Sequence, residues 1–168
     1  MISLSHLNAA SDGEFVAALG GIYEHSDWVP QRVIEQRPFL GMEDLRMALR
    51  QAVDDATDEE KLALIRSHPD LAGKLARAGV LTDASTREQA GLGLDRLSDA
   101  EYEDFSQKNE AYREKFGFPF IICARLSTKQ RVMDGFVKRL GNSRAVEVEE
   151  ALGQIHEIAR LRLGDVFL

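Results

Sequence analysis

Residues 98–117 read Ser98-Asp99-Ala100-Glu101-Tyr102-Glu103-Asp104-Phe105-Ser106-Gln107-Lys108-Asn109-Glu110-Ala111-Tyr112-Arg113-Glu114-Lys115-Phe116-Gly117. Ser98 and Glu101 have the spacing of a capping box, in which each side chain bonds the other residue's backbone amide. Gly117 is suited to the left-handed residue that follows a helix. The large side chains between these ends recur every three to four residues. The stretch therefore predicts a helix from Ser98 to Phe116, with one side formed by Tyr102, Phe105, Asn109, Tyr112 and Phe116.

The same signals recur upstream. Ser11 and Glu14 form a second capping-box pattern, and residues 42–56 carry apolar side chains at helical spacing. Thr57 and Glu60 open a further helix, which must end near His68 because Pro69 disfavours helical geometry in the residue before it.

Downstream, the pattern is first broken and then regular. Glycines divide residues 70–96 into short pieces, within which Ser85 to Glu88 form one more possible cap. Residues 118–124 suit an extended link rather than a sheet, since no second strand is apparent. Two helices follow, around residues 132–140 and 144–163. We therefore predict an all-α, single-domain bundle of about eight helices over residues 1–168, with short helices and loops around its active site.

Composition limits the possible partners and location. The 168 residues are 44% hydrophobic, which is enough for one packed core, and the formal net charge is −7. That charge has the wrong sign for binding nucleic acid or anionic lipid, and no apolar run approaches the length of a membrane span. The single cysteine, Cys123, cannot form an internal disulfide, so we expect a cytoplasmic protein.

Few residues point to chemistry by themselves. His68 sits before a proline at a helix end, where an imidazole can face a cleft. Taken by itself, however, the pattern favours a histidine that completes the helix and meets its dipole. Glu88 could be the third residue of a capping box. Arg160 and Arg162 lie two positions apart and so point in different directions, which leaves at most one for a shared cleft. Lys138 and Arg139 read as solvated surface or ordinary packing.

Metal and thiol chemistry are not indicated. The four histidines include no pair at the i, i+4 spacing of a zinc-binding helix. Cys123 lies in an apolar segment and reads as a packed side chain, because nothing near it in sequence would lower its pKa.

Four segments resemble the 2-oxo-4-hydroxy-4-carboxy-5-ureidoimidazoline (OHCU) decarboxylase family. They are Ser67-His68-Pro69-Asp70-Leu71, the eight residues from Ser85 to Leu92, the thirteen from Asn109 to Ile121, and Glu157-Ile158-Ala159-Arg160-Leu161-Arg162-Leu163. The resemblance implies a homodimeric all-α enzyme that needs neither a metal nor an organic cofactor. Its reaction would be the last step from urate to (S)-allantoin, with loss of carbon dioxide.

The resemblance also assigns roles by position. The family's essential histidine, glutamate and arginine fall on His68, Glu88 and Arg162. Further substrate-binding positions fall on Pro69, Ser85 and Gln89, and on the backbone of Phe120, Ile121 and Ile122.

Two alternative functions stay open at this point. One is a helical module that binds a ureide without turning it over, and the other is a decarboxylase of the same fold acting on a related heterocycle.

Overall fold

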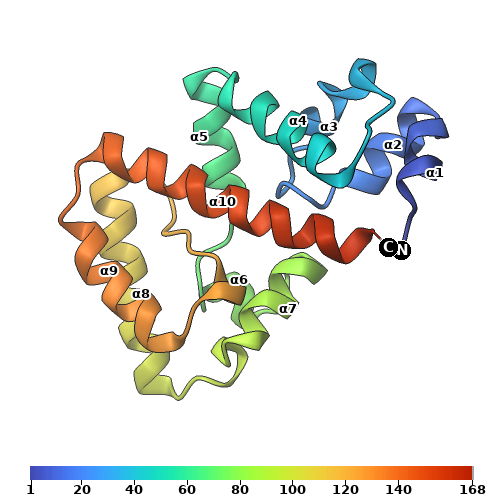
Figure 1. The fold of residues 1–168 in the computed structure, drawn as a ribbon. Helices are drawn as coiled ribbons and strands as arrows, with labels where there is room; N and C mark the ends of the chain where they lie inside the picture. Colours follow the sequence, from blue (N-terminus) through green and yellow to red (C-terminus); the bar gives the residue numbers. More distant parts are fainter. Residues whose placement is uncertain (168) are drawn as a thin grey trace. The chain divides into compact units, whose positions relative to one another are not determined.

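The computed structural model describes residues 1–167, and residue 75 by its backbone alone. Every regular element in this part of the chain is a helix (Figure 1). One isolated β-bridge joins Ile2 to Phe167, where the amide of Ile2 donates to the carbonyl of Val166 at 2.9 Å. The all-α prediction is confirmed. None of the helices described is both long and apolar enough to cross a lipid bilayer.

The chain divides into two compact units, and the last helix contributes to both. Unit 1 comprises residues 1–67 and 156–167, and unit 2 comprises residues 68–155. Unit 1 contains α1 (Leu4–Ala9), α2 (Asp12–Leu19), α3 (Trp28–Gln31), the 3-10 turn Ile34–Gln36, α4 (Met42–Asp54) and α5 (Asp58–Ser67). Unit 2 contains α6 (Lys74–Arg77), α7 (Asp83–Gly91), the 3-10 turn Leu94–Arg96, α8 (Asp99–Phe116), the 3-10 turn Ala124–Leu126 and α9 (Lys129–Leu140). The last helix, α10, runs over Arg144–Val166.

Capping side chains start the long helices where the sequence predicts. Ser98 caps α8 in a capping box with Glu101, and Gly117 ends the helix in the left-handed region with φ 78°. The Ser11 capping box starts α2 in the same way. At α5, the Thr57 hydroxyl accepts from the Glu60 amide while the Glu60 carboxylate accepts from the Thr57 amide.

The start of α7 differs from the prediction. Its cap is Thr82, whose side chain accepts from the amide of Ser85 at 3.2 Å. Ser85 is therefore the third residue of the helix rather than its cap, and Glu88 lies inside the helix rather than in a capping box. The one-turn helices α3 and α6, and α1, are also absent from the sequence prediction, because such short segments have too few residues to show a hydrophobic period.

Unit 1 buries the apolar faces of its longer helices. Phe15 and Leu19 on α2 are fully buried, as is Leu45 on α4. The ring of Phe39 stacks on that of Phe15 with centroids 6.2 Å apart. Asn8 fixes this segment by bonding both the amide and the carbonyl of Phe39, each at 2.9 Å.

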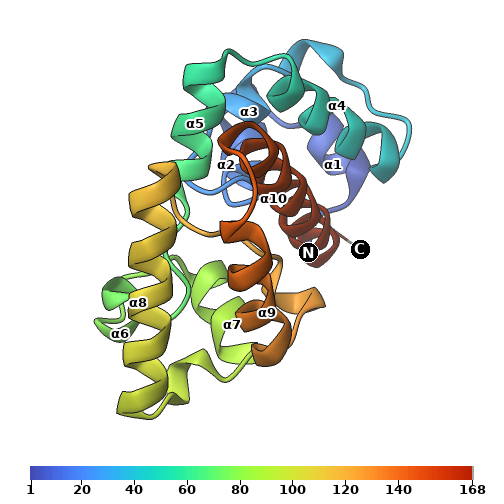
Figure 2. The same ribbon diagram turned by 90° about the vertical axis from the view of Figure 1, so that its left-hand side faces the viewer.

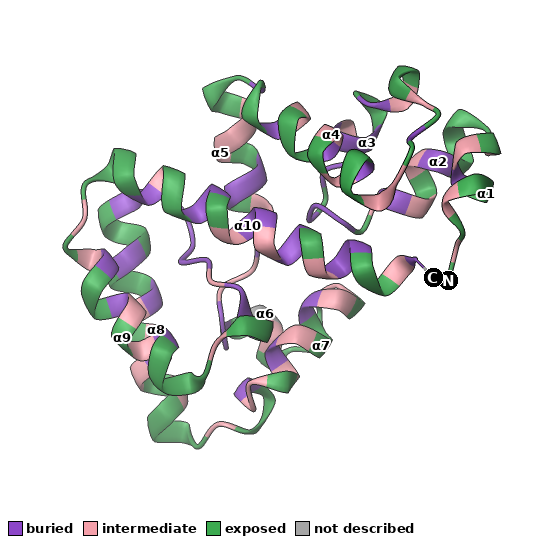
Figure 3. Ribbon diagram, in the orientation of Figure 1, coloured by how far each residue is buried: buried purple, intermediate pink, exposed green. Residues whose placement is uncertain are grey.

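Unit 2 has an aromatic core. In this core α8 packs against α9 (Figure 2). The ring of Phe105 on α8 is edge-on to that of Phe136 on α9. Residues 118–123 of the predicted link form neither helix nor strand, as predicted, and most of them are buried (Figure 3). Ala124, which the prediction includes in the link, begins the 3-10 turn Ala124–Leu126. Phe120 from this link stacks on Phe136 with centroids 4.0 Å apart. The prediction that Cys123 is a packed side chain is confirmed, since it is 2% exposed.

Candidate active site

His68 directly follows the last residue of α5, as the sequence predicts. Its side chain is buried, with 6% of the residue exposed. Pro69 accounts for the helix end, because its ring disfavours helical geometry at His68. The histidine is therefore held at the start of an irregular loop, residues 69–73, in unit 2.

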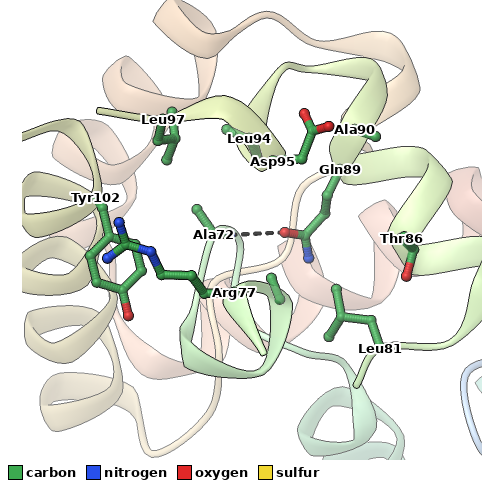
Figure 4. A pocket seen from close by; sticks show the side chains of 11 residues that line it. Ala72, Arg77, Leu81, Thr86, Gln89, Ala90, Leu94, Asp95, Leu97 and Tyr102 are labelled. Atoms are coloured by element: carbon green, nitrogen blue, oxygen red, sulfur yellow. Dashed lines mark hydrogen bonds between the residues drawn. The ribbon is translucent and has the colours of Figure 1, made fainter. Parts of the chain in front are cut away.

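Two helices of unit 2 fix this loop by its backbone. From α7, the Gln89 side chain accepts from the amide of Ala72 at 2.9 Å and donates to the carbonyl of Asp70 at 3.3 Å (Figure 4). From α8, the Asn109 amide donates to the carbonyl of Leu71 at 2.8 Å. These bonds hold Ala72 at a φ of 51°, a conformation that costs a residue with a Cβ of the order of 1 kcal/mol.

An ion pair adds a third attachment for the loop. The guanidinium of Arg113 on α8 contacts both carboxylate oxygens of Asp70, at 3.0 to 3.3 Å. Gly73 approaches Asp70 so closely that a Cβ at this position would lie 2.8 Å from the Asp70 Cβ. The loop after His68 is thus held by the Arg113–Asp70 ion pair and by the close packing of Gly73 against Asp70.

The predicted residues of α7 lie on one face of that helix. Ser85, Glu88 and Gln89 are three and four positions apart, a spacing that places side chains together. Ser85 and Gln89 are buried, and Glu88 is partly exposed. Gln89 therefore brings the loop that follows His68 against the helix that carries Glu88.

The extended link carries the predicted backbone groups. The carbonyl of Ile121 accepts from Arg139 on α9 at 2.5 Å, and the amide of Cys123 donates to Gln154 on α10 at 2.8 Å. The peptide groups of Phe120 and Ile122 make no hydrogen bond to any residue described. The carbonyl of Ile121 is therefore already bonded, whereas the amide of Ile121 and the peptide groups of Phe120 and Ile122 are backbone groups that could bind a ligand.

A buried polar cluster supports this link. Arg139 and Glu147 form an ion pair with a nitrogen-to-oxygen distance of 2.9 Å, and the Tyr112 hydroxyl donates to the Glu147 carboxylate. Burial, together with this carboxylate, raises the pKa of Tyr112 above its ordinary range. Of the two interpretations of residues 138–139, solvated surface and ordinary packing, packing holds for Arg139, which is 6% exposed. Its partner Glu147 lies beyond the next turn of the chain.

Arg162 lies in unit 1, on α10. It is 5% exposed, and its Nη1 atom donates to the Glu24 carboxylate at 2.6 Å and to the carbonyl of Gly21 at 3.2 Å. Arg160 is exposed and pairs with Glu157 on the same helix at 2.9 Å. The two arginines thus point in different directions, as predicted, and Arg162 is the one that is buried.

Unit 1 also contains a polar cluster that sequence reasoning missed. The His156 ring lies between Tyr23, whose hydroxyl is 3.0 Å from Nδ1, and Asp54, whose carboxylate is 3.2 Å from Nε2. Burial lowers the pKa of His156, and Asp54 partly opposes that shift. Neither Glu24 nor His156 belongs to a short motif, since their partners lie more than a hundred residues away.

A cavity of about 160 Å³ lies in unit 2 beside the loop that follows His68 (Figure 4). Its lining includes Ala72 and Gln89 but not His68, Ser85 or Glu88. The cation it contains, Arg77, stacks on Tyr102 and pairs with Asp99 at 2.7 Å. This cavity is therefore not where the predicted catalytic side chains meet.

No group of three or more His, Cys, Asp or Glu side chains that could hold a metal ion occurs among the residues described.

Comparisons with known proteins match almost the whole chain. The family model for OHCU decarboxylase matches residues 8–164. A 2-oxo-4-hydroxy-4-carboxy-5-ureidoimidazoline decarboxylase of Haloferax volcanii is 42% identical over 166 residues, which cover 99% of this chain and 96% of that relative.

Two crystal structures share the fold. One is of (S)-allantoin synthase, with a TM-score of 0.80, 30% identity, and coverage of 100% of this chain and 54% of that one. The other is of an OHCU decarboxylase in the presence of (S)-allantoin, with a TM-score of 0.69, 21% identity, and coverage of 93% and 97%. By its match from residue 8 to residue 164 and its identity to full-length relatives, the chain belongs to the OHCU decarboxylase family.

Proposed function

We propose that this protein converts OHCU to (S)-allantoin and carbon dioxide, the last step in the degradation of urate to allantoin. The observation that carries the proposal is the identity to an OHCU decarboxylase over nearly the full length of both chains. The arrangement of unit 2 is consistent with it, since a buried histidine is held at the start of a constrained loop beside the helix that carries Glu88.

The substrate itself supplies the electron sink. When the carboxylate leaves as carbon dioxide, its bonding electron pair forms a carbon–carbon double bond. The electrons of the adjacent ring carbon–nitrogen double bond move onto the nitrogen, which takes up a proton. The hydroxyl then loses its proton to become a carbonyl, and the neighbouring carbon takes up a proton on one face. The protein must orient the ring and manage these protons, so no cofactor is needed in the proposed mechanism.

Roles follow from residue type. His68 accepts the hydroxyl proton, because an imidazole titrates near neutral pH, and Glu88 shares its hydrogen-bond network. Arg162 binds an anionic or carbonyl oxygen of the substrate through its planar fork of donors. Pro69, Ser85 and Gln89 shape the pocket, and backbone groups of residues 120–122 bind ring or ureido amides. The two bonds that Gln89 makes to the loop indicate that it also holds the His68 segment in place.

The wider assembly is part of the same proposal. The two units act together as one domain, and the protein is a homodimer, as the family resemblance implies. It is cytoplasmic, as the single cysteine favours. Light scattering coupled to gel filtration tests the dimer by its mass, which should be about twice the 18.7 kDa of the chain.

The test must separate catalysis from spontaneous decay, which gives racemic allantoin. OHCU is generated in place from urate with urate oxidase and hydroxyisourate hydrolase, and circular dichroism of the allantoin is followed. We expect the protein to give a rapid, persistent (S)-allantoin signal that His68→Ala abolishes while keeping the helical spectrum. Slow formation of optically inactive product with the wild-type protein would reject the proposal and favour a ureide-binding module or a different heterocyclic substrate.

A further inference from the structure

The loop between α2 and α3, residues 20–27, is unusually buried for a connecting segment. Ile22, Tyr23, Glu24 and Ser26 are each 2 to 3% exposed. Loops normally run over the surface, because a buried loop must satisfy its polar groups without water. This one contacts α10 within unit 1, through Tyr23 at His156 and through the carbonyl of Gly21 at Arg162.

Glu24 is the charged residue of this loop that reaches Arg162. Its carboxylate lies 2.6 Å from Nη1 of the arginine, a distance typical of a charge-assisted hydrogen bond. Both side chains are more than nine-tenths buried. A buried carboxylate is costly unless it is paired, so the position of Glu24 depends on Arg162 and the reverse.

The main chain of Glu24 makes a second connection. Its carbonyl accepts from the Ser26 hydroxyl at 2.9 Å and lies 2.8 Å from the Ser67 hydroxyl. The Ser67 hydroxyl is also 2.6 Å from the carbonyl of Leu64, so its single proton is shared between two acceptors. Ser67 is the last residue of α5, and His68 is the next residue in the chain.

We propose that Glu24 is a positioning residue for the decarboxylation, with its carboxylate orienting Arg162 and its carbonyl fixing the end of α5 from which His68 extends. The inference rests on the function proposed above. It adds one residue, Glu24, that contacts both Arg162 on α10 and Ser67 at the end of α5. A guanidinium binds an oxygen well only when its plane is held in the required orientation, and small displacements of positioning groups are expensive in rate.

The test is a double-mutant cycle in activity. The variants are Glu24→Gln, which keeps shape but removes the charge, Arg162→Gln, and the two combined. We expect Glu24→Gln to lower kcat/KM by about tenfold to hundredfold, and the double variant to be no slower than Arg162→Gln. If Glu24 only stabilised the fold, Glu24→Gln would lower kcat/KM by the same factor whether position 162 holds arginine or glutamine.

A matched control uses the exposed ion pair on the same helix. Glu157→Gln removes a carboxylate from Arg160 by the same chemical change, and it should leave kcat/KM within about twofold of wild type. Ser67→Ala and Ser26→Ala form a second comparison, since both hydroxyls face the same carbonyl. We expect Ser67→Ala to lower kcat more, because only Ser67 adjoins His68.

The outcomes separate the two proposals. If the wild type is active and Glu24→Gln leaves kcat/KM unchanged, the role of Glu24 alone is overturned. The same holds if Glu24→Gln lowers kcat/KM equally with arginine and with glutamine at position 162. Absence of (S)-allantoin formation by the wild type would overturn the proposed function itself. Should Glu24→Gln not fold, Glu24→Asp keeps the charge but shortens its reach, and the same non-additivity with Arg162→Gln is expected of it.

Discussion

At the scale of single residues, burial distinguishes the two arginines near the end of α10. Arg162 is 5% exposed and held by Glu24, whereas Arg160 lies at the surface beside Glu157. We expect Arg162→Lys to lower kcat/KM by at least about tenfold, because an ammonium cannot reproduce a bidentate fork. Arg160→Lys should leave the rate of (S)-allantoin formation unchanged. Equal losses in the two variants would contradict the assignment of Arg162.

His156 makes stability depend on pH. Its pKa in the folded protein is lowered, mainly by burial, so the fold favours the neutral ring. The Nε2 proton is then donated to Asp54 while Nδ1 accepts from Tyr23. The stability contributed by His156 is complete above the unfolded-state pKa, about 6.5, and is lost as the pH falls through the lower folded-state pKa.

Thermal unfolding at two pH values measures this effect. Between roughly pH 7.5 and pH 5, the Tm of the wild type should fall further than that of His156→Gln, whose amide does not titrate. The variant itself should be less stable than wild type at the higher pH, since it loses the shape of the imidazole. An equal fall in Tm for both proteins would show that other groups dominate the acid response.

At the scale of elements, the correction at α7 gives a prediction. Thr82 rather than Ser85 caps the helix that carries Ser85 and Glu88. Thr82→Ala should therefore lower the free energy of unfolding by about 1 kcal/mol, and Thr82→Ser should retain most of it. Urea unfolding followed by circular dichroism measures both. If Thr82→Ala is as stable as wild type, the cap contributes nothing at this helix.

The helix starts were predictable because their signals are local. At α2, α5 and α8 a hydroxyl and a glutamate three residues apart satisfy each other's backbone amides, and both residues are read from one short window. The α7 start was misassigned because Thr82 and Ser85 both have a hydroxyl that could serve as the cap. Local chemistry alone does not decide between two candidates that lie only three residues apart.

The site was predictable only in part, for a related reason. A proline after His68 explains a helix end from two neighbouring residues. The roles of Glu24 and Arg139 depend instead on partners brought close by folding, since Glu24 and Arg162 are separated by 138 positions. Each of these two residues has a charge that suggests the surface when read alone, yet a buried partner neutralises it.

At the scale of the whole molecule, α10 is the one helix shared by the two units, and the chain passes between them twice, after Ser67 and after Ile155. A continuous helix transmits local unfolding along its length, because breaking it exposes backbone groups at the break. We therefore expect the wild-type protein to unfold in a single calorimetric transition, with equal calorimetric and van't Hoff enthalpies.

Gly153, just before the second crossing, tests this coupling. It is exposed, and a Cβ there would meet no atom within 4 Å. Gly153→Ala should stabilise the helix by up to about 1 kcal/mol and raise Tm by roughly 2–4 °C, still in one transition. Gly153→Pro breaks the helix at a cost of about 3 kcal/mol and should separate the melting of the two units. Two transitions in the wild type, or a single unbroadened one in Gly153→Pro, would show that α10 is not what couples the units.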